Sequence, residues 1–173
     1  MGLGKTAQSI SFLQQLRSNP KTRVRGPFLI VAPLSTLPHW EREVSTWTDL
    51  DVVVYHGSRQ SRKLLEQSEF YYRDEHGQEI VSKDLIKLQV LVTSPEMLLV
   101  KEQTALAHMP WRCLVVDEAH RLKNTDSRLT QYLLKFHREH TVLLTGTPLQ
   151  VRCRCGSVGA RTCVCCVCVC VCV

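Results

Sequence analysis

The chain has 173 residues, enough for one domain of ordinary size with a buried hydrophobic core. Its formal net charge is +6, but Arg152, Arg154 and Arg161 supply half of this charge, so the first 150 residues are too weakly basic for charge alone to indicate nucleic acid. The sequence contains no apolar run of the roughly 18 residues that a membrane span needs, and no secretory signal follows Met1. Cys113 is the one cysteine before residue 151. Together these features predict a soluble intracellular domain without disulfides over residues 1–150.

Segments with helical spacing alternate with short apolar runs as far as residue 145. Helices are expected at residues 4–18, 36–47, 58–69, 95–108 and 124–138. Strands are expected at the runs 28–32, 52–55, 90–93, 114–116 and 142–145, which are β-branched and bounded by Pro, Gly or charged residues. This alternation predicts an α/β fold with a parallel, doubly wound sheet and right-handed crossovers. The polar segment 71–84 is expected to be a surface loop.

Residues 151–173 have a different composition from the rest of the chain. Eight of the nine cysteines lie here, and Val167–Val173 is a strict Val-Cys repeat. A translated (GT)n DNA repeat gives only alternating Val and Cys, so we expect a low-complexity tail that is disordered or mistranslated. The alternative is a metal site, because Cys163 and Cys166 have C-x-x-C spacing, but no His or second spaced pair accompanies them.

The start of the chain contains the end of a phosphate-binding loop. Gly4-Lys5-Thr6 matches the last three positions of G-x-x-x-x-G-K-[ST], whose first position would fall two residues before Met1. Glycines let backbone N–H groups approach phosphate oxygens, Lys5 supplies a mobile positive charge, and Thr6 offers a hydroxyl to Mg²⁺. Taken alone, the tripeptide fits equally well a loop that precedes an ordinary helix.

An acidic pair follows a later apolar run. Asp117 and Glu118 come directly after Cys113–Val116, where a buried strand is expected to end, and a doubly wound sheet binds its ligand at that edge. One carboxylate there would hold a metal ion and its neighbour would orient an attacking water. The alternative is a surface acidic pair that begins a helix. The order and spacing of the two motifs in an alternating chain favour a nucleotide-hydrolysis site.

A third motif, Leu144-Thr-Gly-Thr-Pro148, follows the last expected strand. Hydroxyls of Thr145 and Thr147 on a tight loop would sense the γ-phosphate and the carboxylates. In isolation the motif is an ordinary Gly-Pro turn.

Four motifs occur in the order of one known family: Met1-Gly-Leu-Gly-Lys-Thr6, Val31-Ala-Pro-Leu-Ser35, Asp117-Glu-Ala-His120 followed by Arg121-Leu-Lys-Asn124, and Leu144-Thr-Gly-Thr-Pro-Leu-Gln150. Over residues 1–150 the chain resembles the Swi/Snf-related chromatin-remodelling ATPases of helicase superfamily two. Asp117-Glu-Ala-His120 is similar to the DEAH-box motif of that superfamily. Residues 26–41, 46–48 and 54–57 and the polar insertion at 71–84 resemble the chromodomain-helicase-DNA-binding subgroup. The resemblance implies a RecA-like ATP-binding first lobe of a two-lobed, DNA-stimulated motor, which slides nucleosomes in the nucleus.

The resemblance also implies site residues. Gly2, Gly4, Lys5 and Thr6 would bind ATP, Thr6 and Asp117 would hold Mg²⁺, Glu118 would position water, and His120, Thr145, Gly146 and Thr147 would couple the nucleotide to DNA. Lys5, Asp117 and Glu118 would be the catalytic residues. Pro33, Leu34, Ser35 and Thr36 match a motif that contacts DNA; an equal alternative is that Ser35 and Thr36 cap the helix at 36–47. Trp40, Trp47 and Trp111 are expected to be core or interface residues.

The chain also departs from this family. The segment that precedes Met-Gly-Leu-Gly-Lys-Thr in the family, with a first strand, is missing, and Val151 stands where the family has Asn. The second lobe with its arginine finger is absent, and no chromodomain is visible. We therefore expect a lobe that is incomplete at its first strand and inactive alone. The alternatives are a nucleotide- or DNA-binding module without turnover and a gene-model fragment.

Overall fold

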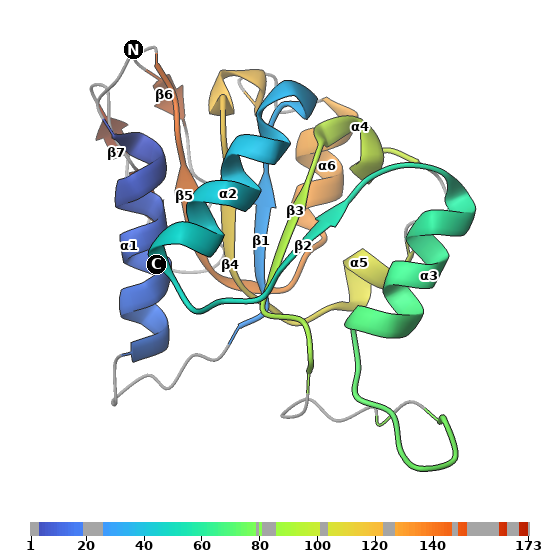
Figure 1. Ribbon diagram of the computed structural model, residues 1–173. Coiled ribbons are helices and arrows are strands. Elements are labelled where there is room, and N and C mark those ends of the chain that lie inside the picture. The colour runs from blue at the N-terminus through green and yellow to red at the C-terminus, as the bar shows by residue number, and fades with distance from the viewer. Residues whose placement is uncertain are drawn as a thin grey trace.

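The computed structural model describes residues 4–18, 26–78, 80, 86–100, 104–122, 127–146, 149–151, 163–165 and 170–172. A six-stranded sheet is covered by helices on both faces (Figure 1). Five strands are mutually parallel: β1 (Phe28–Val31), β2 (Val52–Tyr55), β3 (Val90–Thr93), β4 (Trp111–Val116) and β5 (Arg138–Leu143). The strand order is β2-β3-β1-β4-β5-β8, in which β8 (Cys170–Cys172) pairs antiparallel with β5. The predicted doubly wound α/β sheet is confirmed.

The helices divide into two layers. The main elements are α1 (Lys5–Ser18), α2 (Leu37–Trp47), α3 (Arg59–Glu69), α4 (Pro95–Leu98), α5 (Thr104–His108) and α6 (Arg128–Leu134), with short 3-10 turns η1 (Leu34–Thr36) and η2 (Ala119–Leu122). Phe28 and Ile30 pack in one core with residues of α1 and α2. Leu29 and Val31 pack in the other core, with residues of α4, α5 and α6. Because β1 is covered on both faces, its four side chains are all apolar and fully buried.

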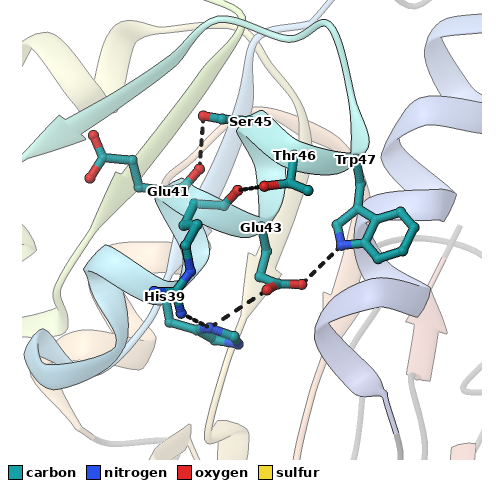
Figure 2. Close-up of polar contacts among 7 residues, drawn as sticks. His39, Glu41, Glu43, Ser45, Thr46 and Trp47 are labelled. Carbon is teal, nitrogen blue, oxygen red and sulfur yellow. Dashed lines mark hydrogen bonds and ion pairs between the residues drawn. The ribbon is translucent and has the colours of Figure 1, made fainter.

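Helix α2 shows how a sequence pattern selects one face. Leu37, Trp40 and Val44 are buried, whereas the polar side chains of the outer face bond to their own helix (Figure 2). Ser45 Oγ donates to the carbonyl of Glu41 at 2.9 Å, and Trp47 Nε1 donates to Glu43 Oε2 at 3.0 Å. This three- and four-residue spacing fixes which face of α2 meets the sheet.

Two predicted helices differ from the structure. The segment 95–108 contains two short helices, α4 and α5, and residues 101–103 between them lie outside the described residues. The predicted helix at 124–138 is shorter, because α6 ends at Leu134 and residue 138 already begins β5. Arg138 donates through Nη1 to the carbonyl of Leu133 at 2.7 Å, so a polar strand residue satisfies the end of the preceding helix. The strand predicted at 142–145 therefore begins earlier and ends at Leu143.

The polar segment after α3 is a surface loop where the structure describes it, at residues 71–78 and 80. Asp74 Oδ1 accepts hydrogen bonds from the backbone N–H groups of His76 and Gln78, at 2.9 and 2.8 Å. Gly77 has φ 76°, the left-handed conformation that glycine adopts without strain. An isolated antiparallel bridge joins Tyr71 to Ile86 at the base of the loop.

Near the end of the chain, β6 (Leu149–Val151) pairs antiparallel with β7 (Cys163–Cys165) in a separate two-stranded sheet. Within residues 151–173 the structure describes only these paired strands and β8. That the tail is disordered or mistranslated therefore stays a prediction. Cys166, the second residue of the C-x-x-C spacing, lies outside the described residues. Within the described segments, no helix is both long and apolar enough to cross a membrane.

Candidate nucleotide site at the carboxyl edge of the sheet

Three parallel strands are joined by backbone hydrogen bonds just beyond their carboxyl ends. The N–H of Asp117, which follows β4, donates to the carbonyl of Val31 in β1 at 2.8 Å. The N–H of Leu144, after β5, donates to Val116 at 2.8 Å, and the N–H of Ala119 donates to Leu144 at 2.8 Å. These bonds fix the Asp-Glu pair and the loop after β5 against one another, at the edge where the sequence predicted them.

Helix α1 begins beside this loop. Gly4 has φ 63°, and its carbonyl accepts the N–H of Gln8 at 2.9 Å, so α1 starts directly after a left-handed residue. A Cβ placed on Gly146 would lie 3.6 Å from the Nζ of Lys5. The first and third predicted motifs therefore meet in space, although 141 positions separate them. Thr6 lies in the first turn of α1 and is half-buried, whereas Gly2 lies outside the described residues.

Both carboxylate oxygens of Asp117 accept hydrogen bonds. Oδ1 accepts the backbone N–H of Glu118 at 2.8 Å, and Oδ2 accepts the indole N–H of Trp40 at 3.1 Å. The side chain is partly exposed, and each oxygen keeps a further lone pair for another ligand. These two donors fix the orientation of the Asp117 carboxylate.

Glu118 stands in an unusual backbone conformation. Its φ is 51°, which is uncommon for a residue with a side chain. Its Oε2 lies 3.0 Å from Nδ1 of His120 at the start of η2, and both side chains are partly exposed. This conformation places backbone strain at one of the predicted site residues.

The loop after β5 supplies the remaining predicted residues. Thr145 is 3% exposed and Gly146 is exposed beside Lys5. Thr147 lies outside the described residues.

The segment predicted to contact DNA forms η1 and the start of α2. Leu34 is 51% exposed and Ser35 is exposed. Thr36 occupies the N-cap position of α2 but makes no capping bond; its hydroxyl donates instead to the carbonyl of Pro33 at 2.8 Å. Thr36 is therefore the N-cap residue by position, as the alternative expected, although its side chain makes no capping hydrogen bond.

The three tryptophans differ in environment. Trp40 and Trp111 are 1% and 0% exposed, as expected for core residues, whereas Trp47 is 64% exposed. The contact between Trp40 and Asp117 was not predicted, because nothing in the sequence relates one indole on a helix to a carboxylate 77 positions away. The one sequence feature that could have indicated this contact is a tryptophan on the apolar face of the helix that follows β1.

The described residues fit ATP with Mg²⁺. A Cβ on Gly4 would meet none of the described atoms within 4 Å, the Lys5 ammonium lies beside Gly146 in the loop after β5, and Trp40 and Glu118 orient the Asp117 carboxylate. No cluster of three or more His, Cys, Asp or Glu side chains suited to a metal occurs in the described part of the chain, so Mg²⁺ here would need phosphate or water oxygens as further ligands. A doubly wound parallel sheet with these motifs at the carboxyl ends of its strands is typical of the RecA-like class of P-loop proteins.

Comparison with known proteins gives the particular family. The SNF2-related domain family matches residues 1–154, and the chain belongs to it. The chain is 51% identical to chromodomain-helicase-DNA-binding protein 7 of Homo sapiens and to chromodomain-helicase-DNA-binding protein 9 of Mus musculus, and 48% identical to chromodomain-helicase-DNA-binding protein 8 of Homo sapiens, each over 150 residues. These alignments cover 87% of this chain but only 5%, 5% and 6% of the three relatives.

A solved structure supports the fold. The Sulfolobus solfataricus SWI2/SNF2 ATPase core in complex with double-stranded DNA matches with a TM-score of 0.65 and 27% identity. The match covers 86% of this chain and 26% of that one. The predicted family and the RecA-like α/β fold are confirmed, and the chain spans a small part of the length of each relative.

Proposed function

We propose that this chain is the first ATPase lobe of an ATP-dependent, DNA-stimulated chromatin remodeller. The observation that supports it most directly is the meeting of Lys5, Gly146 and Asp117 at one edge of the sheet. The three motifs lie far apart in the sequence, and nucleotide binding needs all of them at this edge. Membership of the SNF2-related domain family supports the same conclusion.

In this proposal each residue of the edge has one role. Gly2, Gly4 and Lys5 bind the phosphates, while Thr6 and Asp117 hold Mg²⁺. Glu118 orients the attacking water, and its contact with His120 lets the nucleotide state reach η2. Bound Mg²⁺ would supply charge neutralisation at the phosphates.

The proposed DNA contact is the segment Pro33–Thr36, in which Leu34 and Ser35 are exposed and Pro33 and Thr36 are half-buried. Backbone N–H groups and small hydroxyls near the start of a helix suit phosphate oxygens. The similar SWI2/SNF2 core was solved with double-stranded DNA, and the similar relatives are named as chromodomain-helicase-DNA-binding proteins. We extend this to nucleosomes and a nuclear location as parts of the same proposal.

We propose further that the 173-residue chain binds ATP but turns it over negligibly. The region matched in the SWI2/SNF2 core is 26% of that chain. Charge stabilisation by an arginine finger from a second unit is worth about 10³–10⁵ in rate. The alternative is a nucleotide- or DNA-binding module that does not turn ATP over even when a second lobe is present.

Nucleotide binding is tested by titrating the chain with a fluorescent ATP analogue, with and without Mg²⁺. Lys5→Ala removes the proposed phosphate contact and is expected to weaken binding by about tenfold or more, equivalent to 1.4 kcal/mol. Lys63→Ala removes an exposed lysine of α3 and serves as the matched control. Equal binding by the Lys5→Ala variant, with an unchanged circular dichroism spectrum, would show that the phosphate-loop assignment is wrong.

Turnover is tested by measuring phosphate release with and without duplex DNA. We expect no rate near the roughly 1–10³ per second of ordinary enzymes. A DNA-stimulated rate in that range, abolished by Glu118→Gln, would show that the lobe acts alone. In a longer chain with the upstream segment and a second lobe, activity is expected and should require Lys5 and Asp117.

A further inference from the structure

Trp40 is a core residue whose polar atom reaches the candidate site. Its ring is 1% exposed and packs in the core that α1 and α2 form against the sheet. Its single donor, Nε1–H, lies 3.1 Å from Oδ2 of Asp117. A buried indole N–H needs an acceptor, but a backbone carbonyl would satisfy it equally well, as Leu106 does for Trp111 at 2.8 Å.

The hydrogen bond restricts Asp117 in a specific way. The Glu118 N–H holds Oδ1 and the Trp40 N–H holds Oδ2, so rotation of the carboxylate about its Cβ–Cγ bond would break both bonds. Hydrogen bonds that a charged carboxylate accepts are stronger than hydrogen bonds between two neutral groups. A partner that fixes a metal-binding side chain sets its orientation, and losing such a partner typically costs about 10–100-fold in metal affinity.

We propose that Trp40 is a positioning residue, which holds the Asp117 carboxylate in the orientation that Mg²⁺ requires. This inference rests on the proposed function, since it assigns the Mg²⁺ of that function to Asp117. It gives Trp40 a role besides packing: the ring fills the core, while the N–H sets the carboxylate.

Two matched substitutions separate these roles. Trp40→Phe and Trp111→Phe each remove one indole N–H and leave the same small void in a fully buried place. The hydrogen bond of Trp111 goes to a backbone carbonyl, and its ring packs in the core on the opposite face of the sheet. A purely structural effect would be common to both variants, whereas an effect on Mg²⁺ would belong to Trp40→Phe alone.

The first measurement is the affinity of the full chain, under reducing conditions, for a fluorescent ADP with and without Mg²⁺. In Trp40→Phe we expect the Mg²⁺-dependent gain in affinity to fall by about tenfold. Binding without Mg²⁺ should be unchanged, and Trp111→Phe should keep the full gain. If the unmodified chain gains nothing from Mg²⁺, the proposed function itself fails; if it gains and Trp40→Phe keeps the gain, only the positioning role is overturned.

The second measurement needs no change at Trp40. In the ¹H–¹⁵N spectrum of the full chain, Trp47→Phe and Trp111→Phe assign two of the three indole signals, and the third belongs to Trp40. Mg²⁺ with ADP, and separately Asp117→Asn, should each shift the Trp40 signal and leave that of Trp111 in place. Equal responses of the two buried indoles would overturn the inference, even if Trp40→Phe fails to fold.

Discussion

Glu118 combines a functional position with backbone strain. Its φ of 51° is the one positive value among the non-glycine residues that the structure describes. A left-handed conformation costs an L-residue roughly 1–2 kcal/mol, part of which glycine would recover. The sequence shows only an acidic pair at a strand end, and the strain becomes visible only with the backbone.

We predict that Glu118→Gly stabilises the fold by about 0.5–1 kcal/mol, raising the midpoint of thermal unfolding by about 1–4 °C. The exposed contact with His120 that is lost contributes little. Glu96→Gly is the matched control, because it also removes an exposed glutamate and one exposed ion pair, but from the first turn of α4. That control should be destabilised by about 1 kcal/mol. A lower midpoint in both variants would show that Glu118 is unstrained.

The sequence predicted those residues of the candidate site that belong to a recognisable motif. Lys5, Asp117 and Gly146 lie where a phosphate loop and two strand ends place them, because parallel strands bring their carboxyl ends to one edge. Trp40 was predictable only as a core residue. Its contact with Asp117 depends on how α2 packs against the sheet, which no local sequence pattern reveals.

At the scale of elements, α3 is attached to the sheet through a polar cluster. Arg62 is 8% exposed, and its Nη1 donates to the carbonyl of Gly57 at 2.6 Å and lies 3.8 Å from the sulfur of Met97 in α4. Beside it, the hydroxyl of Tyr55 at the end of β2 donates to Glu66 in a short hydrogen bond. Burial first, and then the Glu66 carboxylate, raise the pKa of Tyr55 well above its usual value. The cluster therefore links α3, the β2 end and α4.

We predict that Arg62→Ala destabilises the fold by about 1–3 kcal/mol, because it leaves the Gly57 carbonyl and the Tyr55–Glu66 pair without a buried donor. Lys63→Ala, at the next position and exposed, should stay within about 0.5 kcal/mol of the parent chain. Urea unfolding of both variants measures this.

A Tyr55→Phe variant tests the pH dependence of stability. Because the pKa of Tyr55 is raised in the folded state, the neutral side chain stabilises the fold below its ordinary pKa of 10.0, and this contribution is lost as pH rises through the folded pKa. The parent chain should thus lose more stability above pH 10 than Tyr55→Phe does.

Element boundaries were the least predictable feature. The core strands were found because β1 is a run of four buried apolar residues and β3 a run of three that ends at the buried Thr93. The start of β5 was missed because Arg138, Glu139 and His140 are polar, and their strand conformation follows from pairing with β4 rather than from their own preference. Arg112 in β4 pairs with Glu139, a cross-strand contact that no window of neighbouring residues reveals.

At the scale of the whole molecule, the sheet has one antiparallel strand on an otherwise parallel array. β8 pairs with the outer edge of β5, through Thr141 with Cys172 and Leu143 with Cys170. The inner edge of β5 pairs over a longer stretch with β4, from Arg138 to Leu143. Among the residues whose burial the structure describes, the two cores lie between Ile10 and Leu144 and contain all five parallel strands.

We predict that removing residues 151–173 improves solubility under non-reducing conditions and leaves nucleotide binding intact. The removed segment holds eight cysteines and an alternating run with high β-propensity and no acidic residue. Such runs promote aggregation, and accessible thiols add intermolecular disulfides. Soluble yield and the midpoint of thermal unfolding are compared for the two chains, each with and without zinc. Because β8 adds only three residue pairs to one edge, the midpoint should change little. A zinc-dependent rise in the midpoint of the longer chain would instead identify the tail as a folded metal-binding element, and the interpretation as a translated repeat would be wrong.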